Sequence, residues 1–277
     1  MPAEMEMKSE GRMNRLSKAL QSQRCGPILG AAAYFYDPIF LEISSRLGFR
    51  AAWIEMEHGF ITFAQAADLC RIAQGLGMLT MIRVADTRRE SVMKAAECGP
   101  DILDVPMANS PEDLHELIRY ARFPPAGERG YFGVSRAVHY GIECNVAEVQ
   151  QELNQEMCLM AQIETSAGVE NAEVICAVPD VDIFLGPADL SASLGVPGQT
   201  GHERVCNAAS LVIRTARKYG KHVAVGAAPQ DLSFWAEQGV DLLFCINNVA
   251  AMRYGAAVAM QQAREAVERA AQRVSGT

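Results

Sequence analysis

Short apolar runs alternate with longer amphipathic stretches along most of the chain. The runs are rich in aliphatic and β-branched residues, and the stretches between them repeat their apolar positions at helical period. This alternation is typical of parallel strands joined by helices. The expected strands cover residues 28–33, 51–56, 79–84, 102–105, 159–163, 181–185, 221–225 and 242–246.

The segments between these strands carry recognisable helix starts. Thr62 precedes the periodic sequence FAQAADLCRIAQGLG, which Gly77 ends, and Ser110 with Pro111 precedes EDLHELIRYAR. Serine and threonine are favoured as N-caps, and proline is favoured at the first helical position. Eight strand–helix units predict an α/β fold, a (β/α)8 TIM barrel, with an extra helix at each end of the chain. A doubly wound open sheet fits the same alternation less well, because no GxGxxG follows the first strand.

A closed barrel requires no domain boundary, so we expect residues 1–277 to form a single domain. Residues 1–12 are expected to be a flexible tail. Residues 123–156 are too long for an ordinary connection and begin with Gly, Pro and aromatic residues, which is typical of a functional loop. Residues 249–273 form an Ala-rich helical pattern with more apolar positions than one barrel face would cover. We therefore expect the C-terminal helix, residues 248–277, to pack on another subunit.

Composition narrows the range of partners. With 277 residues and 49% hydrophobic content the chain can bury a large core. The net charge is −8 and no basic cluster exists, which argues against a nucleic-acid partner. The eight cysteines form no CxxC pair and are expected to be reduced thiols. The N-terminus lacks an apolar signal region, and no apolar run approaches the ~20 residues that span a bilayer, so we expect a cytoplasmic protein without a membrane partner.

Polar residues gather where the expected strands end. They are Glu55, Glu57 and His58 after the second strand, Arg83 at the third, Gln162 and Glu164 at the fifth, and Asp189 after the sixth. Each has a plainer interpretation when taken alone: Glu164 as a solvated loop residue, Asp189 as a helix N-cap, and Arg83 as half of an ion pair. Barrel enzymes place their chemistry at the carboxyl ends of the strands, however, and independent capping would not place every group at that end. The set therefore indicates a site.

Five motifs carry a resemblance to a known family. They are EHG at 57–59, IRV around Arg83, RYARFPPAGERG at 119–130, QIET at 162–165 and GPADLSASLG at 186–195. In this order and with these residues, the chain resembles the HpcH/HpaI family of metal-dependent, class II 2-oxoacid aldolases, from about Gly30 to Ile246.

The resemblance implies roles for the residues that match. Glu164 and Asp189 fall on the two metal ligands, and Arg83 falls on the arginine that binds the ketoacid oxygen and stabilises the enolate. His58 falls on the general base. The positions that contact substrate are matched by Arg83, Gln162, Pro187, Ala188 and Asp189.

Glu97 stands where some members of the family carry an acid that raises the basicity of the histidine. The resemblance therefore implies that Glu97 accepts a hydrogen bond from His58. Members with aspartate at this position have a side chain that is shorter by one methylene group.

The donor chemistry agrees with these roles. Two carboxylates, water and a chelating 2-oxoacid form an all-oxygen set that suits Mg²⁺ or Mn²⁺, with Co²⁺ as a further option. A divalent ion and Arg83 would both stabilise the charge that develops on an enolate. Schiff-base chemistry, the rival route, needs a lysine at a strand end, and none of Lys94, Lys218 and Lys221 ends an expected strand.

The expected activity is that of a divalent-metal-dependent aldolase acting on pyruvate, or a close 2-oxoacid, and an aldehyde. The resemblance also implies a homohexamer built from three dimers, with the C-terminal helix exchanged between partners. One alternative is a related lyase that cleaves a 3-hydroxyacyl-CoA thioester. Another is an oligomeric scaffold with a decayed site, which would have lost a metal ligand or the arginine. The sequence does not identify the aldehyde.

Overall fold

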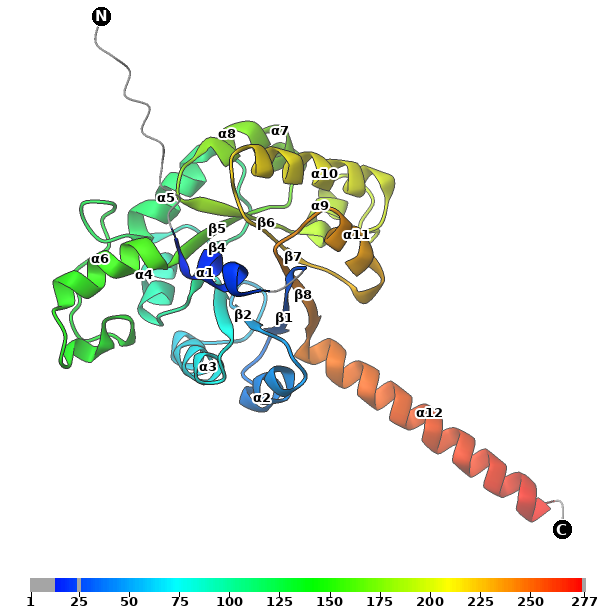
Figure 1. Ribbon diagram of the computed structural model, residues 1–277. Coiled ribbons are helices and arrows are strands. Elements are labelled where there is room, and N and C mark those ends of the chain that lie inside the picture. The colour runs from blue at the N-terminus through cyan, green and yellow to red at the C-terminus, as the bar shows by residue number, and fades with distance from the viewer. Residues whose placement is uncertain (1–12, 24–25, 276–277) are drawn as a thin grey trace, which may run out of the picture.

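Eight parallel strands close into a barrel in the computed structural model, which describes residues 13–23 and 26–275. Each strand pairs with its neighbours in the chain, and β8 pairs with β1 (Figure 1). The strands are β1 Ile28–Ala33, β2 Ala51–Glu55, β3 Leu79–Arg83, β4 Ile102–Val105, β5 Cys158–Ile163, β6 Val181–Leu185, β7 Val223–Gly226 and β8 Leu242–Asn247. The predicted barrel is confirmed, and its strands match the predicted runs to within two residues at each end.

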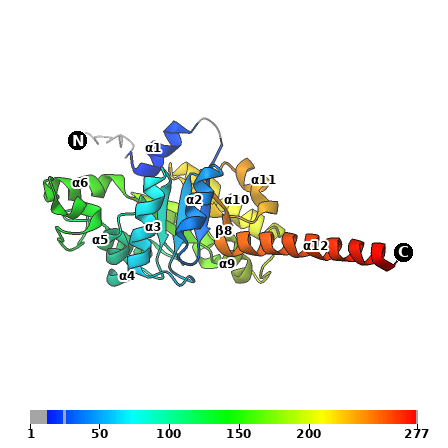
Figure 2. The ribbon, with the colours of Figure 1, turned by 90° about the horizontal axis from the view of Figure 1, so that it is seen from below.

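Helices surround the barrel and cover the outer face of the sheet (Figures 1 and 2). They are α1 Arg15–Ser22, α2 Pro38–Arg46, α3 Phe63–Gly75, α4 Arg89–Glu97, α5 Pro111–Ala121, η1 Arg136–Gly141, α6 Val146–Glu156, α7 Ser166–Glu170, α8 Ala172–Ala177, α9 Pro187–Ser193, α10 Glu203–Lys218, η2 Pro229–Asp231, α11 Leu232–Glu237 and α12 Asn248–Ser275. The expected extra helices at both ends are thus α1 and α12. The expected tail, residues 1–12, lies outside the described residues.

Local sequence fixes several helix starts. Thr62 and Gln65 form a reciprocal capping box at the start of α3, as the predicted N-cap requires. Ser110 and Asp113 form a second capping box at α5, where Pro111 occupies the first helical position. These contacts satisfy backbone N–H groups that have no partner inside the helix.

The alternation of side chains along the strands produces two separate cores. One set packs between the sheet and the helices, and the other fills the lumen of the barrel. In the lumen Trp53 lies 5.2 Å from Phe184 and 5.3 Å from Phe244, measured between ring centroids. Each such buried side chain contributes about 1.5–3 kcal/mol to stability. The packed rings fill the middle of the lumen, and polar groups lie above them at the carboxyl ends of the strands.

The segment 123–156 differs from the expected loop. Its second half folds into η1 and α6, and Phe123, Val138 and Leu153 form a small core of their own with two neighbours. The backbone of Phe123 exchanges two hydrogen bonds with the side-chain amide of Asn154, at 2.7 and 2.9 Å. The prediction of one long loop was therefore wrong, because the apolar periodicity after Asn145 supports a packed helix.

The C-terminal helix α12 leaves the barrel after β8 and extends away from it (Figures 1 and 2). Most of its side chains are exposed, and these include Met252, Val258, Met260 and Val267. In the described part of the chain, no helix is both long enough and apolar enough to cross a bilayer. The seven cysteines within the described ranges are free thiols, as expected.

Candidate active site

A cavity of about 420 Å³ opens at the carboxyl ends of the strands. Its lining includes six of the residues predicted from sequence, namely His58, Arg83, Gln162, Pro187, Ala188 and Asp189. They lie in β3 and β5, in the turn after β2, and in the first turn of α9, which follows β6. The barrel therefore brings together residues that lie more than 100 positions apart in the chain, which is the usual arrangement of a barrel active site.

A buried ion-pair network fixes Arg83 in this cavity. Its Nε donates to Glu55 Oε2 at 2.7 Å, and its Nη1 lies 3.0 Å from Glu57 Oε2. The guanidinium also stacks over the ring of Trp53, 4.9 Å from the centroid. Glu55 is fully buried, and its other oxygen accepts the backbone N–H groups of Glu57 and His58 at 2.7 and 2.9 Å. Glu55 thus joins Arg83 to the turn that carries the histidine.

His58 lies beside Glu57. Its Nε2 is 3.7 Å from Glu57 Oε2, and about two thirds of its side chain is exposed to the cavity and solvent. Burial raises the pKa of Glu57, while Arg83 and His58 act in the opposite direction. The acid adjacent to the imidazole within the chain is therefore Glu57.

Glu164 is held at the end of β5 by two hydrogen bonds. Its Oε1 accepts the backbone N–H of Met107 at 2.7 Å, and its Oε2 accepts from the side-chain amide of Gln162. Only 1% of the residue is exposed, which excludes the interpretation of Glu164 as a solvated loop residue. Burial raises the pKa of this carboxyl to about 7, and the nearby charge of Asp189 adds to the increase.

Gly186 leaves room for this arrangement. A Cβ at this position would lie 2.4 Å from Glu164 Oε2 and 2.6 Å from Gln162 Nε2, which is too close for either atom to stay in place. Gly186 is also the N-cap of α9, and Pro187 is its first residue. Asp189 is therefore in the first turn of α9 and is not its N-cap, so the capping interpretation of Asp189 was wrong.

One carboxyl group of the site was missed by the sequence reasoning. Asp104 in β4 lies beside Arg83 in the sheet register and is fully buried, and neither of its oxygens has a hydrogen-bond partner among the described residues. Burial raises its pKa well above the usual value, Arg83 opposes this, and Glu164 reinforces it. The sequence feature that could have revealed Asp104 is a single acid inside an otherwise apolar strand. The upper layer of the lumen thus contains four acids, Glu55, Glu57, Asp104 and Glu164, around a single arginine.

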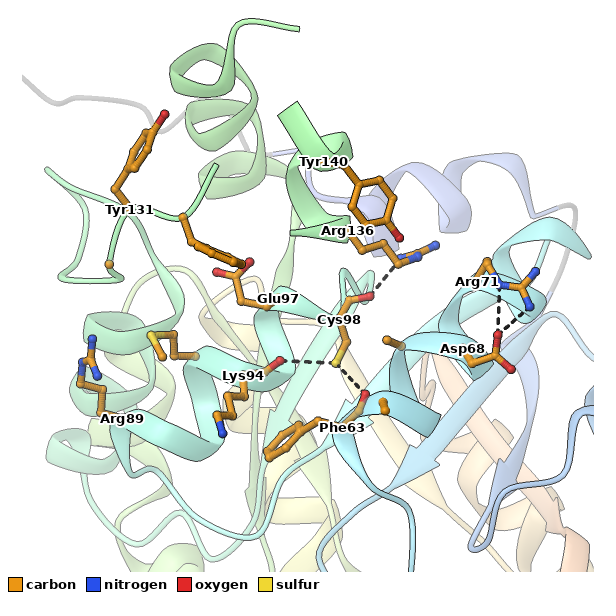
Figure 3. Close-up of a pocket in the computed structure, with 15 residues that line it drawn as sticks. Phe63, Asp68, Arg71, Arg89, Lys94, Glu97, Cys98, Tyr131, Arg136 and Tyr140 are labelled. Atoms are coloured by element: carbon orange, nitrogen blue, oxygen red, sulfur yellow. Dashed lines mark hydrogen bonds and ion pairs between the residues drawn. The ribbon is translucent and has the colours of Figure 1, made fainter. Parts of the chain in front are cut away.

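Glu97 is not part of this cavity. It lies in a second pocket of about 820 Å³, between α3, α4 and the segment 130–140, which is also lined by Arg89 and Lys94 (Figure 3). Its Oε1 accepts a hydrogen bond from Arg129 Nε at 3.0 Å and lies 2.8 Å from Arg129 Nη2, and Arg129 is almost fully buried. The expected hydrogen bond from His58 to Glu97 is not made within the described chain. The predicted contact is absent because Glu97 ends the outer helix α4, whereas His58 follows the barrel strand β2.

Acids, an arginine and a histidine at the strand ends of a barrel, gathered in one cavity, are typical of a (β/α)8-barrel enzyme. The model of the family described as HpcH/HpaI aldolase/citrate lyase matches residues 35–244. The chain belongs to this family, and the predicted resemblance is confirmed.

Individual relatives support the same placement. The chain is 34% identical over 182 residues to a 2-keto-3-deoxy-L-rhamnonate aldolase of Klebsiella pneumoniae. The aligned residues are 65% of this chain and 67% of that protein. It is 32% identical over 165 residues to a hydroxypyruvate/pyruvate aldolase of Sagittula stellata, covering 59% of this chain and 64% of that protein. Among solved structures, an HpcH/HpaI aldolase from Desulfitobacterium hafniense superposes with a TM-score of 0.83 at 30% identity, covering 90% of this chain and 96% of the other.

Proposed function

We propose that the protein is a divalent-metal-dependent lyase that forms or cleaves a carbon–carbon bond between a 2-oxoacid, pyruvate or a close analogue, and an aldehyde. The observation that carries the proposal is the convergence of Glu164, Asp189, Arg83 and His58 on the barrel mouth. The names of the relatives support the same class of reaction, since they are aldolases of pyruvate, hydroxypyruvate or a 2-keto sugar acid.

Glu164 and Asp189 would hold the divalent ion. With two protein ligands, the remaining coordination positions would be left for substrate and water. The surroundings of Glu164 fit a cation: its carboxylate is buried, its pKa is raised, and the Oε1 atom of Gln162 beside it lacks a hydrogen-bond partner. The all-oxygen set favours Mg²⁺ or Mn²⁺, with Co²⁺ possible. When bound, the ion supplies Lewis acidity to the keto oxygen of the substrate.

The protein's own residues would perform the remaining steps. Arg83 is fixed by Glu55 and Glu57, so it places a positive charge where the enolate oxygen develops without reorganising during the reaction. His58 would accept the proton from C3 of the 2-oxoacid or, in cleavage, from the 4-hydroxyl group of the adduct. Glu57, next to His58, would stabilise the protonated imidazole in the role that the sequence assigned to Glu97.

The 3-hydroxyacyl-CoA lyase alternative stays a prediction, and a CoA-ester substrate belongs in the same assay panel. The decayed-scaffold alternative predicts a lost ligand or arginine, and this chain retains both acids and Arg83.

Exchange of the C3 protons of pyruvate in D₂O, followed by NMR, tests the proposal without an aldehyde. We expect exchange that needs added Mn²⁺ or Mg²⁺ and that stops after chelation or in Glu164→Gln. Glu170→Gln, a carboxamide change on the nearby helix α7, serves as the matched control and should retain exchange. Undiminished exchange in chelated protein and in Glu164→Gln would refute the metal mechanism.

We also propose that α12 packs on a second copy of the chain, in a hexamer of three dimers. Its exposed apolar side chains and its extension away from the barrel support this assignment (Figure 2). Light scattering of the intact protein should give about six times the mass of the chain, whereas a monodisperse monomer would refute the assembly. The cytoplasmic location stays a prediction.

A further inference from the structure

The barrel-mouth cavity has a second half that the proposed 2-oxoacid site does not use. The residues assigned to the metal and the 2-oxoacid follow β2, β3, β5 and β6. The remaining wall is built from β1, β7, β8 and the start of α12, and it includes Tyr34, Asn247, Arg253 and Tyr254. Because the 2-oxoacid would occupy the first half, the second half is where the aldehyde would bind.

The start of α12 directs one face toward this second half. Ala250, Arg253 and Tyr254 are three and four positions apart, which places them on the same side of a helix, and all three line the cavity. The side chain of Asn247 accepts the backbone N–H of Ala250 at 2.7 Å and fixes the first turn. The guanidinium of Arg253 lies 5.7 Å from the ring centroid of Tyr254. Arg253 thus lines the cavity from the first turns of a regular helix, with its side chain exposed.

The two arginines that line the cavity, Arg83 and Arg253, differ in their ion pairs. Arg83 forms ion pairs with Glu55 and Glu57, whereas no ion pair to Arg253 is formed within residues 13–23 and 26–275. Asp231 lines the same half, where its carboxylate accepts a hydrogen bond from Thr200 at 2.7 Å and forms no ion pair with Arg253. A guanidinium without a carboxylate partner, at the edge of a small cavity, is suited to bind an anionic oxygen group of a ligand.

We propose that Arg253 selects the aldehyde by binding an anionic group, a carboxylate or a phosphate, at the end of the aldehyde remote from its carbonyl carbon. This inference rests on the proposed function and specifies the class of the second substrate. The apolar floor formed by Phe244 and Phe184 would contact the carbon chain between the two ends. Arg253 is thereby a specificity residue, and it takes no part in the chemistry at C3 of the 2-oxoacid.

Matched aldehyde pairs test the assignment. The first pair is 4-oxobutanoate and butanal, which differ by a terminal carboxylate; the second is glyceraldehyde 3-phosphate and glyceraldehyde, which differ by a phosphate. For each aldehyde, kcat/KM for condensation with pyruvate is measured in the parent, Arg253→Ala and Arg253→Lys. Arg264→Ala on the exposed part of α12 is the control.

For at least one pair, we expect the parent to prefer the charged member and Arg253→Ala to lose about tenfold or more in kcat/KM for it, as removal of one charge-assisted hydrogen bond predicts. The neutral member should change less than twofold, Arg253→Lys should retain part of the preference, and Arg264→Ala should match the parent. The pair that shows the preference identifies the anion. Equal losses for charged and neutral aldehydes, or no loss in Arg253→Ala, would overturn the inference.

Pyruvate C3 exchange separates this failure from failure of the proposed function. If exchange persists in Arg253→Ala and the aldehyde preference does not change, the specificity assignment is wrong and the proposed function stands. If the parent shows no exchange with any divalent ion, the proposed function fails and the assignment fails with it.

Discussion

The barrel mouth and the outer pocket between α3 and α4 are both lined by charged residues, yet they differ in what holds those charges. At the mouth, Arg83 and Glu164 are buried. Arg83 pairs with Glu55 in β2 and with Glu57 after it, and Glu164 accepts from Met107 after β4 and from Gln162 in its own strand. In the outer pocket, Arg71 pairs with Asp68 on its own helix (Figure 3), and Lys94 pairs with Glu90 on its own helix. Glu97 is the exception, because it pairs with the buried Arg129 of the segment after α5. The outer pocket is the larger cavity, at about 820 Å³ against about 420 Å³.

Size and the presence of charge are therefore weak guides to the reactive site. Groups fixed by partners from several strands are preorganised, and preorganised charge is what stabilises a developing enolate. Exposed pairs on one helix contribute little, about 0.3–0.5 kcal/mol each. The comparison predicts large functional effects at the mouth and small ones in the outer pocket.

The largest effect is expected at Arg83. Arg83→Lys keeps a positive charge but cannot contact Glu55 and Glu57 together in the same geometry, so kcat should fall by about 100-fold or more. Arg89→Lys makes the same change in the outer pocket and should leave kcat within twofold of the parent. Steady-state kinetics of adduct cleavage measure both, and similar rates for the two variants would remove the distinction between the sites.

Gly186→Ala should have the next largest effect. The added Cβ would displace Glu164 or Gln162, and a shift of about 1 Å in a ligand can cost about 100-fold in rate. Gly75→Ala, where a Cβ meets nothing within 4 Å, is the control. The apparent Mn²⁺ affinity should weaken only in Gly186→Ala, and a variant that binds Mn²⁺ like the parent would show that this glycine is not needed for space.

The stability of the metal-free protein should depend on pH because of the carboxyl group of Glu164. Its pKa is raised to about 7 from the ordinary 4.5, so the folded chain binds this proton more tightly than the unfolded chain. The free energy of unfolding therefore falls as the pH rises from about 4.5 to about 7, and the penalty above that range is about 3 kcal/mol.

Glu164→Gln removes this titration. In urea denaturation with chelator present, the variant should be more stable than the parent at pH 8, and this advantage should disappear near pH 4.5. A difference between the two proteins that is the same at both pH values would contradict the assignment.

The smallest effect on catalysis is expected at Glu97. Glu97→Gln should leave the pH profile of pyruvate exchange unchanged, because the acid beside His58 is Glu57. The variant should instead lose stability, since Arg129 is buried and pairs with Glu97. A shift of the acidic limb of the exchange profile in Glu97→Gln would show that Glu97 acts on the histidine after all.

The strands were predictable because a parallel sheet is buried on both faces, so each strand is a nearly continuous apolar run. The residues that follow the strands were predictable for a related reason: closure of the barrel places all carboxyl ends together. This rule alone predicts that the cavity is lined by His58, Arg83 and Asp189.

Other features depend on packing that the sequence does not display. Glu97 was assigned to His58 by its position in a motif, but its contact is decided by how the segment after α5 returns to α4. Asp104 was missed because one acid in an apolar strand does not show which way it points. The helix α6 was missed because the Gly- and Pro-rich start of its segment outweighed the helical period after Asn145.

The central claim is that Glu164 and Asp189 hold a divalent ion at the barrel mouth. Titration of metal-free protein with Mn²⁺, with free Mn²⁺ followed by electron paramagnetic resonance, tests this claim directly. We expect one ion per chain, bound at least tenfold more weakly in Glu164→Gln and in Asp189→Asn and with unchanged affinity in Glu97→Gln. Parent-like binding in both mouth variants, or weakened binding in Glu97→Gln alone, would contradict the account.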